Sequence, residues 1–417
     1  MHRPRHAVLV AGLLLAACAR EQAPAPAAAA GGPQAWALPT QPGAAQPDLV
    51  ATAADGTLLL SWISNVPGRR KALQFAAFGG DGRWQSAPRT IAVGHSLLAD
   101  WADTPHIAAT PDGALWVHWL QKTGAGEAAN IMLSRSVDGG FNWSAPAQVN
   151  AQDPTAEHGF VALWPATQDT LGVAWLDGAP GGEAAPEADA DAAVDAGTSL
   201  HAARFDRLLA RSDAARIDVR ACDCCQTAAA RTTRGALLAY RDRSADDIRD
   251  IAVTRFDGKA WSAPTLVHAG IFQPSACPVN GPALAAHGDA VVVAWYTAAG
   301  GTPSVQLARS DDAGAHFAAP VAVDRGEAVQ GRVAVALDAA QAWVLWVRED
   351  AGGQSLQLAR YAPDLSRRLA QVEVAKLQGR GTATGVPQLA LREDGAWIVW
   401  TDIEAGAPLL RGAHVAP

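Results

Sequence analysis

The residues best able to do chemistry in this sequence are four cysteines in the second half of the chain. Three of them lie in the segment Cys222-Asp223-Cys224-Cys225, and the fourth is Cys277. Thiols at such close spacing form disulfides in exported proteins, and as thiolates they bind soft metal ions such as copper(I) or zinc(II). A third interpretation is a redox-active pair of neighbouring thiols. The spacing matches no standard zinc finger, so the sequence leaves the three interpretations open.

Histidines and charged residues elsewhere in the chain are further candidates. His106 and His158 stand beside the expected starts of two strands, where each is either a ligand of the same site or a core or capping residue. A glycosidase needs two carboxylates, or a carboxylate and another nucleophile, flanking one bond, and the structural alternative is a network of salt bridges between loops. The candidates for catalysis are Asp103, Glu157, Asp177, Arg241 and Asp242.

A repeated pattern of short strands must position these residues. A hydrophobic run ending in an aromatic residue recurs seven times, about every 50 to 65 residues. Its aromatic residues are Trp62, Trp119, Trp175, Tyr240, Trp295, Trp346 and Trp400. This period is typical of a β-propeller, in which each four-stranded blade buries its faces against its neighbours. We therefore expect an all-β, seven-bladed propeller, with six blades as the alternative, and aromatic residues buried between blades.

The two ends of the propeller sequence are expected to meet. The seventh repeat reaches a third strand near Leu409 to His414 without a fourth. An unpaired edge strand promotes aggregation. The segment from Ala35 to Pro39 precedes the first repeat, and we expect it to pair beside that third strand and close the ring.

Propeller topology predicts which candidates lie on the same side. Loops from the outer strand of one blade to the inner strand of the next share a face with the ends of the second strands. The candidate cysteines, histidines and charged residues all fall in such positions. We expect them at one mouth of the central channel, with Cys277 close to the Cys222–Cys225 segment.

Two segments resemble the Asp-box, S-x-D-x-G-x-x-W, of sialidase-like propellers, also known as BNR-repeat propellers. The matching residues are Ser136, Asp138, Gly140 and Trp143 in the first segment, and Ser310, Asp312, Gly314 and Phe317 in the second. The resemblance implies a structural turn between the third and fourth strands of a blade, away from the catalytic face. It also implies an exo-acting, sialidase-like glycoside hydrolase as one possible activity. Known sialidases have six blades, however, and their Arg-Ile-Pro-type motif is missing here.

The first 18 residues have the pattern of an export signal. A positively charged start is followed by an apolar stretch from Ala7 to Ala17, which is too short to span a bilayer. The stretch ends in a segment that resembles a bacterial lipobox and places Cys18 as the lipidated residue. We therefore expect a signal peptide over residues 1–18, an Ala/Pro-rich tether over 19–34 and a propeller domain over 35–417. The lipid would anchor the protein in the cell envelope, at the outer membrane, facing the periplasm or the cell surface.

Charge excludes one class of partner. The formal net charge is −8, and no cluster of Lys and Arg follows the signal segment, whereas nucleic-acid binding requires such clusters. The sequence predicts a monomeric lipoprotein that binds a ligand at its mouth, with copper or zinc as a candidate. A glycan, another small ligand or an envelope protein is the alternative partner. The alternative function is the sialidase-like hydrolase.

Overall fold

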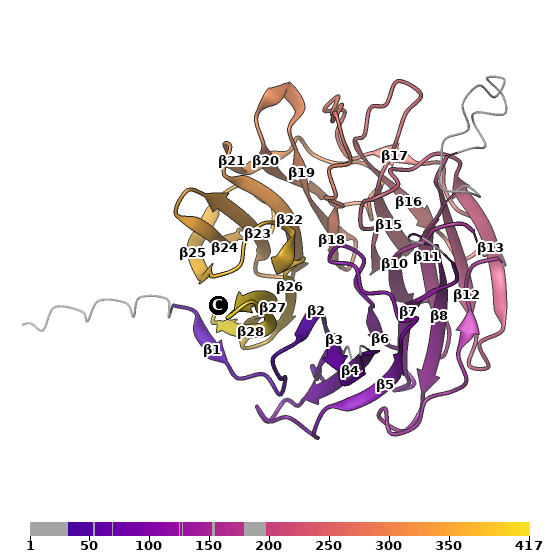
Figure 1. Cartoon of the computed structure of the whole chain (residues 1–417). Helices are drawn as coiled ribbons and strands as arrows, with labels where there is room; N and C mark the ends of the chain where they lie inside the picture. The colour runs from indigo at the N-terminus through magenta and orange to yellow at the C-terminus, as the bar shows by residue number, and fades with distance from the viewer. Residues whose placement is uncertain are drawn as a thin grey trace, which may run out of the picture.

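The computed structural model describes residues 32–417, apart from residues 53, 54, 69, 125, 127, 152–154 and 179–196. In this part of the chain 28 strands form seven four-stranded antiparallel sheets around a common centre (Figure 1). The protein is therefore a seven-bladed β-propeller, as the repeat predicts. No helix among the described residues is long and apolar enough to cross a membrane. The lipidation candidate Cys18 lies outside the described residues.

Six blades follow the chain in order, each beginning with its innermost strand. Blade 1 contains β2 (Ala44–Ala51), β3 (Leu58–Val66), β4 (Arg70–Phe78) and β5 (Arg89–Gly94). Blade 2 contains β6 (Ile107–Ala109), β7 (Leu115–Lys122), β8 (Ala129–Ser136) and β9 (Ala147–Gln148). Blade 3 contains β10 (His158–Pro165), β11 (Leu171–Asp177), β12 (Ser199–Phe205) and β13 (Arg211–Asp218).

The second half of the ring repeats this arrangement. Blade 4 contains β14 (Ala228–Thr232), β15 (Gly235–Arg241), β16 (Ile251–Phe256) and β17 (Thr265–Leu266). Blade 5 contains β18 (Ala283–His287), β19 (Ala290–Thr297), β20 (Ser304–Ser310) and β21 (Val321–Arg325). Blade 6 contains β22 (Val329–Leu337), β23 (Ala342–Asp350), β24 (Gly353–Tyr361) and β25 (Arg368–Leu377). Two short 3₁₀ helices, η1 (Ala299–Gly301) and η2 (Gly381–Thr384), lie in loops.

Blade 7 joins the two ends of the propeller domain. Its strands are β26 (Gln388–Arg392), β27 (Gly395–Glu404), β28 (Ala407–Val415) and, at the outer edge, β1 (Gln34–Trp36). Strand β1 pairs antiparallel with β28 (Figure 1), with Gln34 opposite His414 and Trp36 opposite Gly412. The expected closure is confirmed, although the strand begins one residue before the expected segment and ends at Trp36 instead of Pro39.

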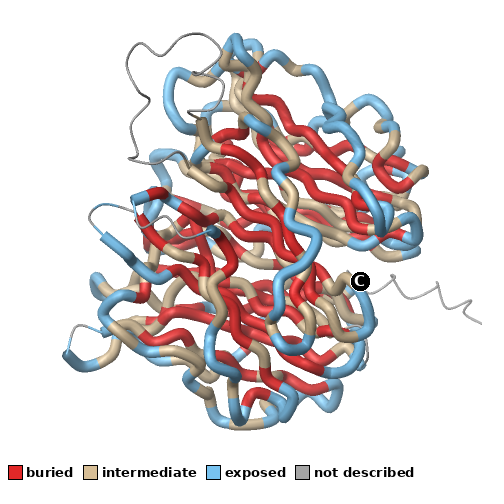
Figure 2. Tube along the Cα trace, turned by 90° about the vertical axis from the view of Figure 1, so that its right-hand side faces the viewer, coloured by how far each residue is buried: buried red, intermediate tan, exposed pale blue. Residues whose placement is uncertain are grey.

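The core lies between blades, where the second strands place their aromatic residues. All seven predicted aromatic residues are buried, with exposed fractions from 0% to 7%. Trp346 of blade 6, for example, packs in one cluster with Val292 and Val305 of blade 5. Buried residues run along the strands inside the molecule and exposed ones along its loops (Figure 2). Burial of these faces between neighbouring blades is the main stabilising contribution.

Both Asp-box segments form the expected turns. In the first, the Ser136 hydroxyl donates to Asp138 Oδ1 (2.9 Å) and accepts from the Gly140 N–H (2.9 Å). Gly140 has a φ of +81°, and a Cβ there would lie 2.0 Å from the Phe75 ring of blade 1. Trp143 also meets Phe75, with ring centroids 5.8 Å apart. The turn therefore locks blade 2 against blade 1, which is a structural role.

Candidate functional site

Loops between blades meet across one mouth of the channel. The Gln226 side chain donates to the Ala102 carbonyl (2.8 Å) and accepts from the Gly281 N–H (2.8 Å). The Arg332 guanidinium lies 5.0 Å from the centre of the Trp101 ring. These contacts join the loops that lead into blades 2, 4 and 5, and they join the loop before blade 2 to the inner strand of blade 6. A cavity of about 320 Å³ in the channel is lined by the inner strands, and of the candidate residues His106 lines it.

Asp103 and His106 fasten neighbouring blades. The buried Asp103 carboxylate accepts from the Phe160 N–H of blade 3 (2.8 Å), and burial raises its pKa to about 7. His106 Nδ1 lies 3.0 Å from Asp48 Oδ1 of blade 1. Burial alone would lower the pKa of His106, but the attraction of the Asp48 carboxylate outweighs burial, so the pKa of His106 lies above its ordinary value. Both side chains are therefore engaged in contacts between blades.

The shifted pKa of Asp103 predicts a pH-dependent stability. Because the folded pKa of about 7 exceeds the ordinary value of 3.8 for an aspartate, the contribution of Asp103 to stability is full below about pH 4 and is lost as pH rises through about 7. The variant Asp103→Asn keeps an acceptor for Phe160 and does not titrate. We expect the free energy of unfolding of the wild type, relative to this variant, to fall between about pH 4 and pH 8, measured by urea denaturation.

The control for this prediction is Asp138→Asn on the opposite side of the propeller. Hydrogen bonds from Asn142 lower the pKa of Asp138 to about 2, so the difference between this variant and the wild type should be constant above about pH 5. A pH-independent difference for Asp103→Asn as well would contradict the assignment.

His158, Glu157 and Asp177 lie together at the start of blade 3. His158 is buried, with Nδ1 2.9 Å from the Ala129 carbonyl of blade 2 and Nε2 3.6 Å from Asp177 Oδ1. Asp177 Oδ2 accepts from the Trp175 indole (2.9 Å). The Glu157 residue is exposed. His158 therefore joins blade 3 to blade 2, and Asp177 holds His158 from within blade 3, so these contacts give both residues a structural role.

Arg241 and Asp242 support the cysteine-bearing loops. The buried Arg241 guanidinium donates to the carbonyls of Asn280 (2.7 Å), Arg249 (2.6 Å) and Tyr296 (2.9 Å). It thus holds the loop that carries Cys277 against blade 4. The backbone of Asp242 forms an isolated antiparallel β-bridge with Ala221, which directly precedes the cysteine segment. Burial, together with nearby carboxylates, raises the pKa of Asp242 to about 6.

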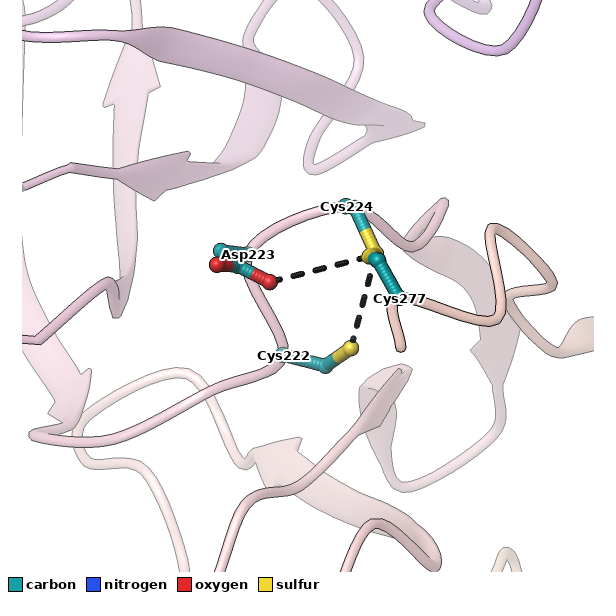
Figure 3. A group of neighbouring side chains, drawn as sticks. All are labelled: Cys222, Asp223, Cys224 and Cys277. Carbon is teal, nitrogen blue, oxygen red and sulfur yellow. Dashed lines mark hydrogen bonds between the residues drawn. A yellow bond between two sulfur atoms is a disulfide. The ribbon is translucent and has the colours of Figure 1, made fainter. Parts of the chain in front are cut away.

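The four cysteines do come together. Cys224, in the loop between β13 and β14, forms a disulfide with Cys277, in the loop between β17 and β18, with Cα atoms 6.3 Å apart (Figure 3). The expected closeness of Cys277 to the Cys222–Cys225 segment is thus confirmed. Cys222 and Cys225 are not bonded to each other, and their sulfurs lie 3.3 Å apart. The Cys224 sulfur is 3.9 Å from each of them.

The surroundings of the two unbonded thiols differ in charge. Both residues are buried, and an Arg249 N–H points at the Cys222 sulfur from 3.7 Å. A hydrogen bond from Cys225, supported by Arg241 and Arg249, lowers the pKa of Cys222 to about 6, whereas burial raises the pKa of Cys225. Cys222 is therefore the sulfur that more readily carries a negative charge.

One carboxylate lies beside the clustered sulfurs. The donor atoms of Cys222, Asp223, Cys224 and Cys277 all lie within 4.8 Å of one another, and Asp223 points its carboxylate at the bridged sulfurs (Figure 3). Neither His106 nor His158 belongs to this group, so the histidines expected as possible co-ligands lie apart from it. Asp223 and Arg249 lie beside the sulfurs but were not among the predicted site residues. The position of Asp223 between two cysteines was the available signal.

The described part of the chain is thus a seven-bladed β-propeller that carries a cysteine cluster in the loops at one mouth of its channel. No model of a known protein family matches the chain, and no curated protein matches it significantly. Among solved structures it is similar to the Hadza microbial sialidase Hz136, with 13% identity, a TM-score of 0.45 and coverage of 82% of this chain and 73% of that one. Similarity to the α-L-arabinofuranosidase Arb93A from Fusarium graminearum covers 93% of this chain and 97% of that one, with 11% identity and a TM-score of 0.47. Similarity to the NanB sialidase from Streptococcus pneumoniae covers 87% of this chain and 83% of that one, with 8% identity and a TM-score of 0.48. Likenesses at this level carry no information on the activity of this chain.

Proposed function

We propose that this protein is a binding protein of the bacterial cell envelope that holds one soft metal ion, copper(I) or zinc(II), at its reduced cysteine cluster. The observation that carries the proposal is the spacing of the sulfurs. A tetrahedral ion bound by thiolates at about 2.3 Å holds its sulfurs about 3.8 Å apart. The sulfurs of Cys222, Cys224 and Cys225 are separated by 3.3, 3.9 and 3.9 Å.

The surrounding charges suit a thiolate site. Several thiolates in a largely buried place repel one another unless cations offset their charge. Arg249 faces the Cys222 sulfur, and the Arg241 guanidinium lies close enough to favour thiolates at both Cys222 and Cys225. Both guanidiniums are buried, so their charge is screened little by solvent.

The ion requires the reduced state of the site. In the disulfide form Cys224 and Cys277 cannot act as thiolates, so two of the four sulfurs are lost as ligands. After reduction, Cys277 remains beside the segment because Arg241 holds the Asn280 carbonyl of the same loop. Asp223 offers a carboxylate oxygen at the exposed side of the cluster.

Location in the envelope is the second part of the proposal. The signal-like segment and the lipobox-like Cys18 support attachment to a membrane through a lipid. The propeller would then present its cysteine-bearing mouth to a compartment in which thiols are oxidised and reduced by other proteins. We expect a monomer, with no nucleic-acid partner.

Metal titration of the reduced protein tests the proposal. In a Cys18→Ser background, we expect one copper(I) or zinc(II) ion per chain, with the cluster thiols protected from alkylation when the ion is bound. Replacing Cys222 or Cys277 by Ser should weaken binding at least about tenfold, because a ligand is removed. Bound metal is measured by elemental analysis and affinity by competition with a chromogenic chelator.

The matched control compares two carboxylates. Asp223→Asn should weaken binding, whereas Asp138→Asn, in an Asp-box turn on the opposite face, should leave it unchanged. A reduced protein with four titratable cluster thiols that retains no ion would overturn the proposal.

A further inference from the structure

The two unbonded thiols lie behind a disulfide that faces solvent. Cys222 and Cys225 are each about 1% exposed, whereas Cys277 is exposed and Cys224 is half-buried. The bridge joins two loops from neighbouring blades (Figure 3). A small reductant or another protein therefore reaches the bridge first, and the inner thiols are within reach of its sulfurs from inside the molecule.

The distances suit exchange within the chain. Thiol–disulfide exchange is the attack of a thiolate on one sulfur of a disulfide, with the other sulfur as leaving group. The Cys222 sulfur lies 3.9 Å from the Cys224 sulfur and 3.3 Å from the Cys225 sulfur. The Arg249 N–H at the Cys222 sulfur stabilises a negative charge there. The Cys225 sulfur is equally far from the Cys224 sulfur (3.9 Å), so the contact with Arg249 is what distinguishes Cys222 as the attacking sulfur.

We propose that the oxidised site interconverts between two disulfide isomers, the bridge Cys224–Cys277 between loops and the bridge Cys222–Cys225 within one loop. In the first step the Cys222 thiolate bonds to the Cys224 sulfur and the Cys224–Cys277 bond breaks, leaving its electron pair on Cys277, which takes up a proton. In the second step the Cys225 thiolate bonds to the Cys222 sulfur, and the electron pair and a proton pass to Cys224. One disulfide is present before and after, and two thiols remain throughout, so that no oxidant or reductant is consumed.

The sulfurs that form the second bridge, those of Cys222 and Cys225, already lie 3.3 Å apart. Cys222 and Cys225 have the C-x-x-C spacing that is common in thiol–disulfide oxidoreductases. When the bridge to Cys224 breaks, only a short segment around Cys277 becomes free to move, because the loop is anchored by hydrogen bonds on both sides of that segment. The Asp250 carboxylate accepts from the N–H groups of Ile271 (2.8 Å) and Phe272 (3.2 Å) on one side. Asn280 is held by Arg241 on the other. The propeller can thus change isomers without opening a blade.

The isomers differ in what they present to a partner. The bridge between loops leaves two buried thiols, whereas the bridge within the loop leaves two accessible thiols, at Cys224 and Cys277. In the second isomer, the free thiols can reduce the disulfide of a partner protein, or Cys277 can form a mixed disulfide with it. In the first isomer the free thiols are buried and cannot react with a partner. The site thereby becomes a thiol–disulfide exchange site for another dithiol or disulfide protein. This inference goes beyond the proposed metal site, since both isomers are oxidised and metal-free.

Peptide mapping of the oxidised, metal-free protein tests the inference. Protein with Cys18→Ser is incubated without reductant, quenched with acid, alkylated at free thiols and cleaved with trypsin. The three clustered cysteines fall in the peptide 221–231 and Cys277 falls in another, so the two isomers give a crosslinked pair and a looped peptide, respectively. We expect both species, with alkylated Cys277 at least about tenfold more abundant than in Cys222→Ser, which lacks the attacking sulfur.

A second variant keeps the test decisive if Cys222→Ser does not fold. Cys225→Ser should stop after the first step and yield the Cys222–Cys224 bridge with a free Cys277. Recovery of the Cys224–Cys277 bridge alone, in both the wild type and Cys225→Ser, would overturn the inference. That result would leave metal binding by the reduced protein unaffected, so the two proposals fail separately.

Discussion

Replacing Trp346 by alanine is expected to destabilise the propeller by about 3–5 kcal/mol. Trp346 is fully buried between blades 5 and 6, where it packs with Val292 and Val305. Its indole N–H also donates to Asp324 Oδ2 (2.7 Å). The substitution therefore leaves a cavity and removes a partner from a carboxylate. Urea denaturation followed by intrinsic fluorescence measures the change.

The matched control is the exposed aromatic residue Phe141. It is 71% exposed, and the Arg89 guanidinium lies 3.4 Å from the centre of its ring. Phe141→Ala should cost no more than about 1 kcal/mol. Equal costs for the two variants would show that burial between blades does not stabilise this fold.

Deleting residues 35–39 is expected to lower the melting temperature by roughly 5–10 °C or to cause aggregation. The deletion removes most of β1 and exposes the edge of β28. It also removes Trp36, which stacks on Trp84 with ring centroids 5.2 Å apart and meets Trp397 edge-on at 4.9 Å. Calorimetry of the deletion variant and the wild type measures the shift.

A point variant separates the effect of backbone pairing between β1 and β28 from the effect of aromatic packing by Trp36. Trp36→Ala keeps the backbone partners of β1 and loses the aromatic contacts, so its melting temperature should fall between those of the deletion and the wild type. An unchanged melting temperature in the deletion variant would mean that closure by β1 contributes nothing.

The fold could be predicted because one physical requirement recurs in every repeat. Each blade must bury a large side chain against the next, and residues such as Trp119 and Tyr240 mark that position in the sequence. The Asp-box turn around Asp138 was predictable for a similar reason, since its hydrogen bonds are local. The bounds of β1 were less predictable because its partner β28 lies at the other end of the chain.

The site was predictable only in part. The topology brought Cys277 to Cys224, because neighbouring loops meet. The topology placed the charged candidates on the same side, but it did not tell which of them have structural partners. Arg241 binds three carbonyls and Asp103 binds a backbone N–H, and such contacts depend on loop conformations. The same holds for Arg249, whose approach to Cys222 joins residues from two different loops.

X-ray absorption at the metal edge tests the central claim, a soft metal ion bound by the clustered sulfurs, most directly. The measurement is made on the reduced Cys18→Ser protein loaded with one equivalent of zinc(II) or copper(I). We expect a first shell dominated by sulfur, at about 2.3 Å for zinc, and we expect sulfur to be lost from it in Cys222→Ser. A first shell of nitrogen and oxygen alone, or the same spectrum in Cys222→Ser, would contradict the claim.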